Sequence, residues 1–267
     1  MYAFKYHRAK SVAGASGAVA KNPDAKLLAG GQSLVAAMKL RLAHPEELVD
    51  LGAIKELAGI KVTANTVTIG AMTRHAEVAA SAEVKKAIPA LASLVESIGD
   101  RQVRNMGTLG GSIANNDPAA DYPAGLVGLA ATVNTNKRKI GADDFFTGMY
   151  ETVLEPGEVI TSVAFPVPKR AAYMKFKNPA SRFAIVGVFV ADTGSGVRVA
   201  VTGAAPVVFR VAEMEKALAA KFAPESVASI KVSADGLTSD FHAKADYRAH
   251  LITVMARRAV ESALHTR

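Results

Sequence analysis

The segment from Arg104 to Pro123, RNMGTLGGSIANNDPAADYP, sets the strongest limit on how this chain can fold. It places a Gly-Gly pair among asparagines and follows the pair with Asp-Pro and Tyr-Pro steps. Glycine and proline both weaken the interior of regular elements, so this mixture argues against an ordinary helix or a central strand. A second Gly-Gly pair lies 80 residues earlier, in the segment LLAGGQSL from Leu27 to Leu34. The fold must therefore accommodate two stretches of nearly bare backbone.

The composition excludes several classes of protein. Half of the 267 residues are apolar, which is enough for two or three packed units. The chain has no cysteine, so disulfides, thiolate nucleophiles, zinc–thiolate sites and iron–sulfur ligation within it are excluded. Its six histidines are scattered without metal-ligand spacing, and it holds no GxGxxG, P-loop or GxSxG motif. We therefore expect neither a hydrolase complete in this chain nor a metal site.

The charge is unevenly distributed. The net charge is +8, and the residues from Pro168 onward hold 15 Lys and Arg against 8 Asp and Glu. A basic C-terminal third favours an acidic partner, but the basic residues are too scattered to indicate nucleic-acid binding. The N-terminus has no continuous apolar run typical of a signal peptide, and no segment is long enough to span a membrane. We expect a cytoplasmic protein with no transmembrane segment.

The pattern of apolar residues predicts an α+β protein. Residues 25–51 are typical of a strand–turn–helix–strand unit, and residues 124–136 of a helix that leads into a strand. Pro166 and Pro168 indicate a domain boundary. Further helices are predicted over residues 74–80, 84–98 (interrupted at Pro89), 209–222 and 246–264. Further strands are predicted over residues 158–168, 183–192 and 195–205, with a hairpin over 59–72.

The two Gly-Gly segments are candidates for phosphate binding. Glycine allows a ligand to approach the backbone closely, and exposed N–H groups are good donors to phosphate oxygens. Ser33 accompanies the first pair, and Thr108 and Ser112 flank the second. A lone Gly-Gly pair is more often a simple tight turn than a ligand site. Two such pairs in separate units suggest two walls around one diphosphate.

Four segments resemble the FAD-binding subunits of the molybdenum hydroxylases, the family that includes the medium subunit of carbon monoxide dehydrogenase and the FAD-binding subunit of xanthine dehydrogenase. They are LLAGGQSL, IGAMTRHAEVA, IGDRQVRNMGTLGGSIANNDPAADYPA and YMKFKNPASRFAIVGVFVA. The resemblance implies a two-subdomain FAD-binding domain of the vanillyl-alcohol-oxidase type over residues 1–167, with subdomains of about 1–55 and 56–167. It also implies a smaller α+β domain over residues 168–267, with a three-stranded sheet and a helix cluster.

The resemblance also implies a set of FAD-contacting residues, with no catalytic or metal-binding residue among them. Asp121 could instead cap the helix that follows it, Ile98 and Ile160 could be plain core residues, and Lys177 lies close enough to Lys175 to replace it. Arg182 departs from the acidic residue that the family often carries there. The full set is Leu28, Ala29, Gly30, Gly31, Gln32, Ser33, Leu34, Ala71, Thr73, Ile98, Gly107, Thr108, Gly110, Gly111, Ser112, Ala114, Asp117, Asp121, Ile160 and Lys175.

The function implied is that of an electron-transfer flavoprotein subunit with non-covalent FAD. The molybdenum cofactor and the [2Fe-2S] clusters would reside on partner subunits, a large one and a small one, in a dimer of heterotrimers. A chain without cysteine fits this division of labour, because it cannot ligate iron–sulfur clusters itself. Two alternatives stay open at this stage: a stand-alone flavin oxidase of the vanillyl-alcohol-oxidase type, and an anion-binding or nucleic-acid-binding module.

Overall fold

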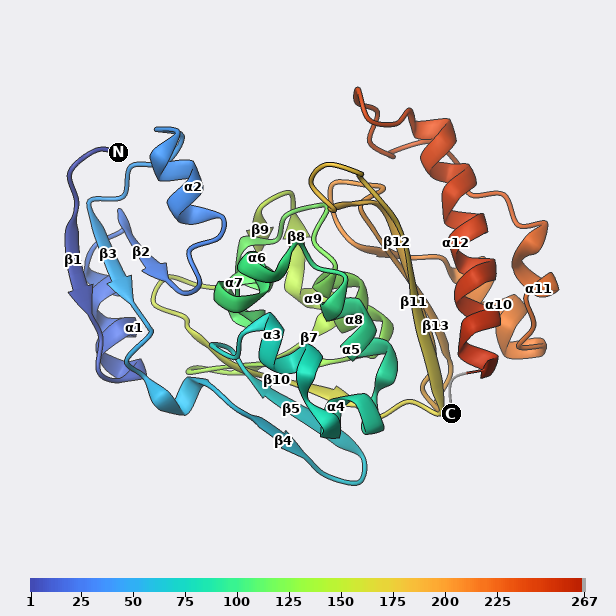
Figure 1. Ribbon diagram of the computed structural model, residues 1–267, viewed down its shortest axis with the longest axis horizontal. Helices are drawn as coiled ribbons and strands as arrows, with labels where there is room; N and C mark the ends of the chain where they lie inside the picture. Colours follow the sequence, from blue (N-terminus) through green and yellow to red (C-terminus); the bar gives the residue numbers. More distant parts are fainter. Residues whose placement is uncertain (266–267) are drawn as a thin grey trace.

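The computed structural model describes residues 1–265, and these form three layered units side by side (Figure 1). The N-terminal unit is a small parallel sheet packed against α1, whose Ser11 N-cap accepts a hydrogen bond from the Gly14 N–H at 3.1 Å. Ala15, Val49 and Leu51 fill the space between helix and sheet. The elements are β1 (Lys5–Arg8), α1 (Val12–Lys21), β2 (Ala25–Leu28), α2 (Leu34–Lys39) and β3 (Glu47–Asp50), with the strands in the order β1-β3-β2.

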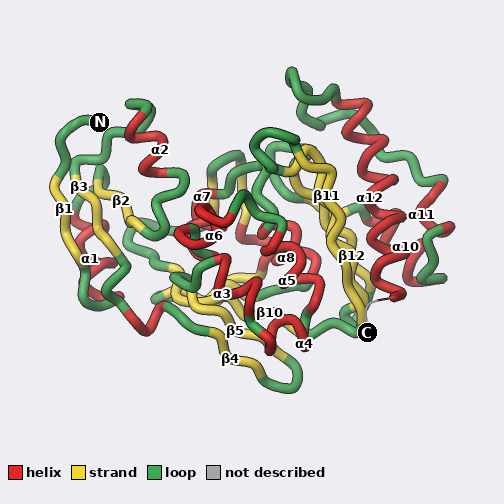
Figure 2. The backbone as a smooth tube through the Cα atoms, viewed as in Figure 1, coloured by secondary structure: helices red, strands yellow, loops and turns green. Residues whose placement is uncertain are grey.

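The middle unit is a five-stranded antiparallel sheet with short helices over one face (Figure 2). Its strands follow the order β4-β5-β10-β6-β7. They are β4 (Ile60–Val62), β5 (Thr66–Gly70), β6 (Thr132–Thr135), β7 (Lys139–Gly141) and β10 (Ile160–Pro166). The helices are η1 (Lys55–Leu57), α3 (His75–Ala80), α4 (Ala82–Ala87), α5 (Pro89–Glu96), α6 (Arg101–Met106), α7 (Leu109–Asn115), α8 (Tyr122–Gly128) and α9 (Ala142–Phe145), and a hairpin is formed by β8 (Phe146–Gly148) and β9 (Glu151–Thr152).

The prolines and glycines act locally as the sequence suggested, with one exception. Pro89 begins α5 at the position where its missing N–H costs nothing, so the predicted long helix is two helices. The expectation that residues 104–123 contain no ordinary helix is wrong, because the second Gly-Gly pair lies inside α7. Thr108 caps that helix by accepting the Gly111 N–H at 3.2 Å. The small residues let α7 lie very close to its neighbours, a long-range effect that composition does not reveal.

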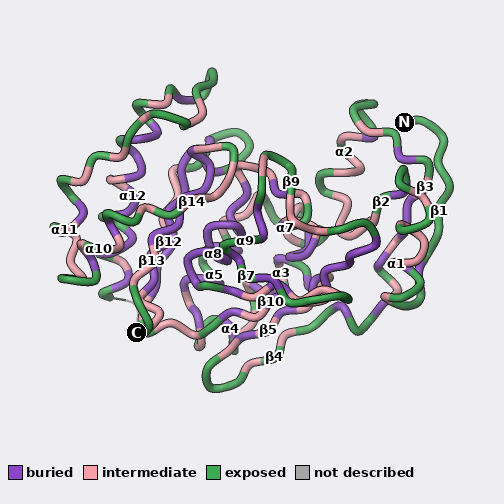
Figure 3. The backbone as a smooth tube through the Cα atoms, turned by 180° about the vertical axis from the view of Figure 1, so that it is seen from behind, coloured by how far each residue is buried: buried purple, intermediate pink, exposed green. Residues whose placement is uncertain are grey.

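The C-terminal unit is an antiparallel sheet buried between two layers of helices (Figure 3). β12 is buried along almost its whole length, because α12 covers one face of the sheet while α5 and α8 lie against the other. The sheet has a short fourth strand, Phe209–Arg210, where we expected the start of a helix and three strands in all. Its elements are β11 (Arg170–Lys177), β12 (Ala184–Asp192), β13 (Val197–Thr202), β14 (Phe209–Arg210), α10 (Ala212–Ala220), α11 (Glu225–Ala228) and α12 (Ala245–His265).

The overall class is α+β, as expected. Within residues 1–265, every helix is too short or too polar to cross a bilayer. The arrangement places the loop after β2 opposite α6 and α7, and a cavity lies between the first two units.

Candidate functional site

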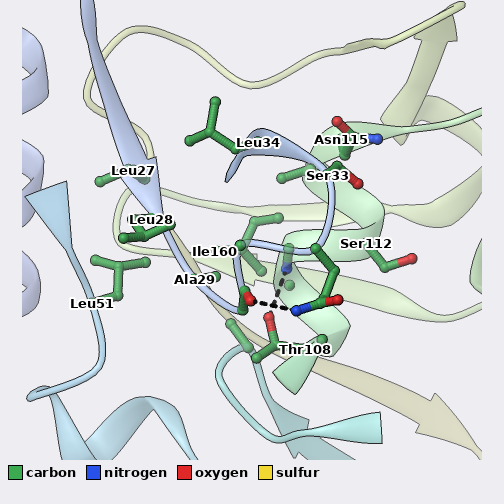
Figure 4. Close-up of a pocket in the computed structure, with 18 of the residues that line it drawn as sticks. Leu27, Leu28, Ala29, Ser33, Leu34, Leu51, Thr108, Ser112, Asn115 and Ile160 are labelled. Carbon is green, nitrogen blue, oxygen red and sulfur yellow. Dashed lines mark hydrogen bonds between the residues drawn. The ribbon is translucent and has the colours of Figure 1, made fainter. Parts of the chain in front are cut away.

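A cavity of about 500 Å³ lies between the N-terminal and middle units (Figure 4). One wall is the loop after β2, the carboxyl end of a parallel strand, which is where open α/β sheets bind their ligands. The opposite wall is α7 with the turn before it. All but three of the predicted contact residues line the cavity: Leu28, Ala29, Gly30, Gly31, Gln32, Ser33, Leu34, Ala71, Ile98, Gly107, Thr108, Gly110, Gly111, Ser112, Ala114, Asp117 and Ile160.

The loop from Ala29 to Ser33 is built for close approach. Gly31 has a φ of 71°, a conformation that glycine adopts at little cost. Gly30 is pressed so tightly against the neighbouring turn that a Cβ there would lie 2.1 Å from the Met106 carbonyl oxygen. The N–H groups of Gly31, Gln32 and Ser33 donate no hydrogen bond within residues 1–265. The loop therefore presents several neighbouring donors to whatever fills the cavity.

The second Gly-Gly pair has a different role from the one expected. The Gly110 N–H donates to the Ala71 carbonyl oxygen at 2.8 Å, and the Gly111 N–H donates to the Thr108 hydroxyl. These amides are therefore not free for a ligand, and neither glycine has a positive φ. Their absent side chains matter instead, because a Cβ on Gly110 would lie 2.7 Å from the Ala71 Cβ. The first loop supplies backbone donors, whereas the second supplies a close-fitting wall.

Three predicted residues do not line the cavity. The Thr73 hydroxyl is used within the protein, where it donates to the Gly59 carbonyl oxygen at 3.0 Å. Asp121 and Lys175 form a buried ion pair, with 2.9 Å between the Lys175 Nζ and the Asp121 Oδ1. Asp121 is the N-cap residue of α8 by position, as the alternative proposed, but its carboxylate makes no capping hydrogen bond to that helix. Lys177, the alternative to Lys175, ends β11 on the surface.

The ion pair belongs to a buried polar cluster directly behind the cavity wall. The Tyr173 hydroxyl donates to Asp121 at 2.5 Å, and Lys175 donates to the Ser97 carbonyl oxygen at 3.0 Å, next to the cavity residue Ile98. Burial raises the pKa of the Asp121 carboxyl, while Lys175 and Tyr173 oppose that rise. Burial and the neighbouring Asp121 also raise the pKa of the Tyr173 phenol well above its ordinary value. The cluster consequently keeps a charge pair out of water beside the site.

Several lining residues carried no signal in the sequence. Tyr150 and Phe183 are exposed aromatics at the cavity. Tyr150 has a φ of 57° and donates its N–H to the Asn116 carbonyl oxygen. Asn116 has a φ of 42°, and its side-chain amide donates to the carbonyl oxygens of Gly148 and Glu151 at 2.8 Å each. The Asn115-Asn116 pair at the end of α7 was the one available indication. The lining residues that we did not predict are Lys26, Leu27, Leu51, Met72, His75, Asn115, Ala120, Tyr150, Leu154, Glu158, Val159 and Phe183.

Glu158 is a buried carboxylate at the cavity that is fully paired. Burial alone would raise its pKa, but hydrogen bonds from Arg138, the Glu155 N–H and Thr135 outweigh that effect and lower the pKa to about 2. The two bonds from Arg138 measure 3.0 Å each. Glu158 is therefore ionised, and its oxygens already accept hydrogen bonds from the protein. It holds the chain just before Val159 and Ile160 against the cavity.

His75 lies under the Gly107 turn and is only 4% exposed. Its Nδ1 has no hydrogen-bond partner within residues 1–265, and the same holds for the nearby Tyr122 hydroxyl. Burial, helped by the charge of Arg104, lowers the pKa of His75 to about 4. The imidazole is consequently neutral at physiological pH.

His75 should make folding sensitive to acid. The unfolded chain binds a proton at this histidine near its ordinary pKa of 6.5, whereas the folded chain binds it only near 4, so stability falls as the pH drops through this window. The expected loss is about 2–3 kcal/mol. His75→Phe should flatten the pH dependence of urea unfolding between these values, while the same change at the exposed His250 should not. Equal pH profiles for wild type and His75→Phe would contradict this assignment.

Comparison with known proteins agrees with the fold and the cavity. Residues 2–168 match a family described as FAD binding domain in molybdopterin dehydrogenase, and residues 171–263 match the CO dehydrogenase flavoprotein C-terminal domain. The carbon monoxide dehydrogenase medium chain of Hydrogenophaga pseudoflava is 37% identical, over 97% of this chain and 96% of the relative. The xanthine dehydrogenase FAD-binding subunit of Escherichia coli O157:H7 is 28% identical, over 97% and 95% of the two chains.

The solved structure of a similar protein has the same fold. Carbon monoxide dehydrogenase from Hydrogenophaga pseudoflava, in a form lacking the Mo-pyranopterin moiety, contains a chain that superposes with a TM-score of 0.91 at 37% identity, covering 99% of this chain and 98% of that one. The fold and site thus define a flavoprotein subunit of the oxidoreductase class. The chain belongs to the family of FAD-binding medium subunits of molybdenum hydroxylases, and FAD is its cofactor.

Proposed function

We propose that this chain passes electrons from iron–sulfur clusters on a partner subunit, through non-covalently bound FAD, to an external acceptor. The observation that carries the proposal is the cavity between the loop after β2 and α7, in a chain of the FAD-binding family. The absence of cysteine supports the division of labour, because this chain cannot ligate the one-electron centres itself. Its near-complete coverage of the medium chain from Hydrogenophaga favours a subunit over a stand-alone oxidase.

The residues present fit a dinucleotide. The unpaired N–H groups of Gly31, Gln32 and Ser33 would hold the diphosphate of FAD, since clustered backbone donors suit phosphate oxygens without any need for lysine. Ser112 would add a hydroxyl from the opposite wall. Tyr150 and Phe183 would shield the bound cofactor from water at the mouth. When bound, the flavin supplies the conversion between one-electron donors and a two-electron acceptor.

The position of the polar cluster favours a supporting role for three further residues. Asp121 and Lys175 lie directly behind the wall that contains Ile98 and Ala120, so they would fix that wall rather than touch the cofactor. Thr73 would hold the turn that carries Ala71. The FAD-binding domain would comprise residues 1–167, with subdomains of about 1–55 and 56–167, and the remainder would form the second domain.

We further propose that the assembly is a cytoplasmic dimer of heterotrimers, in which a large subunit carries the molybdenum cofactor and a small one carries the [2Fe-2S] clusters. The medium chains among the relatives come from multi-subunit enzymes by name, which supports the proposal. The basic residues after Pro168 would orient docking to an acidic partner face, mainly by raising the association rate.

The experiment that tests the function is reconstitution. Natively purified complex should contain one FAD per chain of this subunit, and heat or acid should release that flavin into the supernatant. Adding the partner subunits to the FAD-loaded chain should restore substrate-dependent flavin reduction, whereas the chain alone should show none. Turnover of an organic substrate by the isolated chain at about 1–10³ s⁻¹, the usual range for enzymes, would favour the stand-alone oxidase instead.

A further inference from the structure

The loop between β11 and β12, residues 178–183, carries Phe183 into the cavity wall. Its shape is set by one buried side chain, that of Asn178, which is 8% exposed. The Asn178 Oδ1 accepts the N–H groups of Ala180 at 2.9 Å and Ser181 at 3.1 Å. The Asn178 backbone closes the loop, since its N–H donates to the Phe183 carbonyl oxygen and its own carbonyl oxygen accepts the Arg182 N–H, both at 2.9 Å.

The side-chain NH₂ of Asn178 makes a contact outside the loop. Its Nδ2 lies 3.0 Å from the Nδ1 of His242, in the segment that leads into α12. The Oδ1 is already committed to two backbone donors, so the amide has only one acceptable orientation and the Nδ2 must face the histidine. An amide NH₂ can only donate, which makes the His242 Nδ1 an acceptor and puts the imidazole proton on Nε2.

The backbone of His242 is held by hydrogen bonds to its surroundings. The Asp240 carboxylate accepts the His242 N–H at 2.9 Å and the Ala243 N–H at 3.0 Å. The other oxygen of Asp240 receives a hydrogen bond of 2.8 Å from Arg248, a buried residue of α12. Arg248 also donates to the carbonyl oxygen of Ile185 at the start of β12, at 2.6 Å. Hydrogen bonds that lead to the last helix therefore hold the backbone of His242 in place.

The loop also carries local strain that needs such support. Arg182 has a φ of 63°, which is unfavourable for a residue with a side chain, and it directly precedes Phe183. The Arg182 guanidinium donates to the Gly99 carbonyl oxygen at 3.2 Å, which ties the loop to the segment before α6. Phe183 is 49% exposed, so packing alone does not fix it in place.

We propose that Asn178 and His242 are positioning residues, by which the C-terminal segment fixes the 178–183 loop and with it the Phe183 wall of the FAD site. The proposal rests on the proposed function for its link to FAD. It assigns the segment before α12 a part in shaping a cofactor site to which it contributes no lining residue. Loosening the hydrogen bond should increase the mobility of the loop and weaken FAD binding, without unfolding the protein.

The test compares four variants of the full chain. In His242→Asn the Oδ1 takes the place of the Nδ1 acceptor, whereas His242→Leu removes the acceptor at similar size. Asn178→Ala removes all three hydrogen bonds of the Asn178 side chain. His250→Leu is a matched control at an exposed histidine of α12. His242 is exposed, so its variants should keep the thermal unfolding midpoint of the wild type. Two quantities are measured: hydrogen–deuterium exchange of the amides of residues 180–183 without FAD, and the dissociation constant of FAD.

His242→Leu should speed exchange at these amides and weaken FAD binding, each by about 2- to 12-fold, the equivalent of one net hydrogen bond. Asn178→Ala should exceed that effect, and His242→Asn and His250→Leu should stay within about twofold of the wild type. Unchanged exchange in His242→Leu, equal effects of His242→Leu and His242→Asn, or a loosened loop with unchanged FAD affinity would each overturn the proposal. If the wild type binds no FAD even in the assembled complex, the proposed function fails, while the exchange measurement still decides whether His242 holds the loop.

Discussion

Replacing Gly30 by alanine is expected to remove most of the affinity for FAD. The new Cβ would lie 2.1 Å from the Met106 carbonyl oxygen and 2.7 Å from the Gly107 Cα, both of which belong to the backbone and cannot rotate away. The loop after β2 must then move off the opposite wall and carry its unpaired N–H groups with it. Overpacking of this kind costs about 3 kcal/mol, which corresponds to about 100-fold in affinity. A flavin titration of the purified variant measures the effect.

Two comparisons show whether close approach is the cause. Gly17 in α1 has nothing within 4 Å of an added Cβ, so Gly17→Ala should bind FAD as the wild type does. Ser112→Ala removes one hydroxyl from the cavity wall and should cost about 0.5–1.5 kcal/mol, the net worth of a single hydrogen bond. Similar losses in Gly30→Ala and Ser112→Ala would show that the fit between the two walls is not what binds the cofactor.

The parts of the site that the sequence predicts well are those where local chemistry leaves little choice. A Gly-Gly pair at the end of an apolar strand predicts a close-approach loop, and the cavity does lie against Gly30 and Gly31. The interruption at Pro89 was predicted because proline is rejected in a helix interior, and the structure places Pro89 at the first position of α5, where proline is accepted. Such features depend on a few consecutive residues, and a sequence displays those directly.

The parts that sequence reasoning missed depend on residues far apart in the chain. Gly110 and Gly111 are ordinary helical residues whose importance comes from Ala71 and Ala29 lying against them, which no local pattern reveals. Phe183 reaches the cavity because Asn178 bends the loop before it and His242 braces Asn178 from 64 residues away. The resemblance identified Asp121 and Lys175 as polar residues of the site, but it could not say that they satisfy each other.

The mutual pairing of Asp121 and Lys175 leads to the largest stability effect that we expect. Both side chains are deeply buried, with exposures of 4% and 5%, so removing one partner leaves the other charge without compensation in a place that water does not reach. Lys175→Met should lower the free energy of unfolding by about 3–5 kcal/mol. Guanidinium unfolding of the FAD-free protein measures this loss independently of any contact with the cofactor.

The double variant Asp121→Asn/Lys175→Met is the decisive companion, because it removes both charges and keeps similar volumes. It should regain most of the lost stability, since replacing a buried pair as a whole is often close to neutral, and the Tyr173 hydroxyl can still donate to the amide oxygen that replaces the carboxylate. A double variant as unstable as Lys175→Met would mean that the two charges do not compensate each other. If Lys175→Met instead keeps its stability without FAD and loses only FAD affinity, Lys175 acts on the cofactor itself, and its pairing with Asp121 contributes little to the stability of the FAD-free protein.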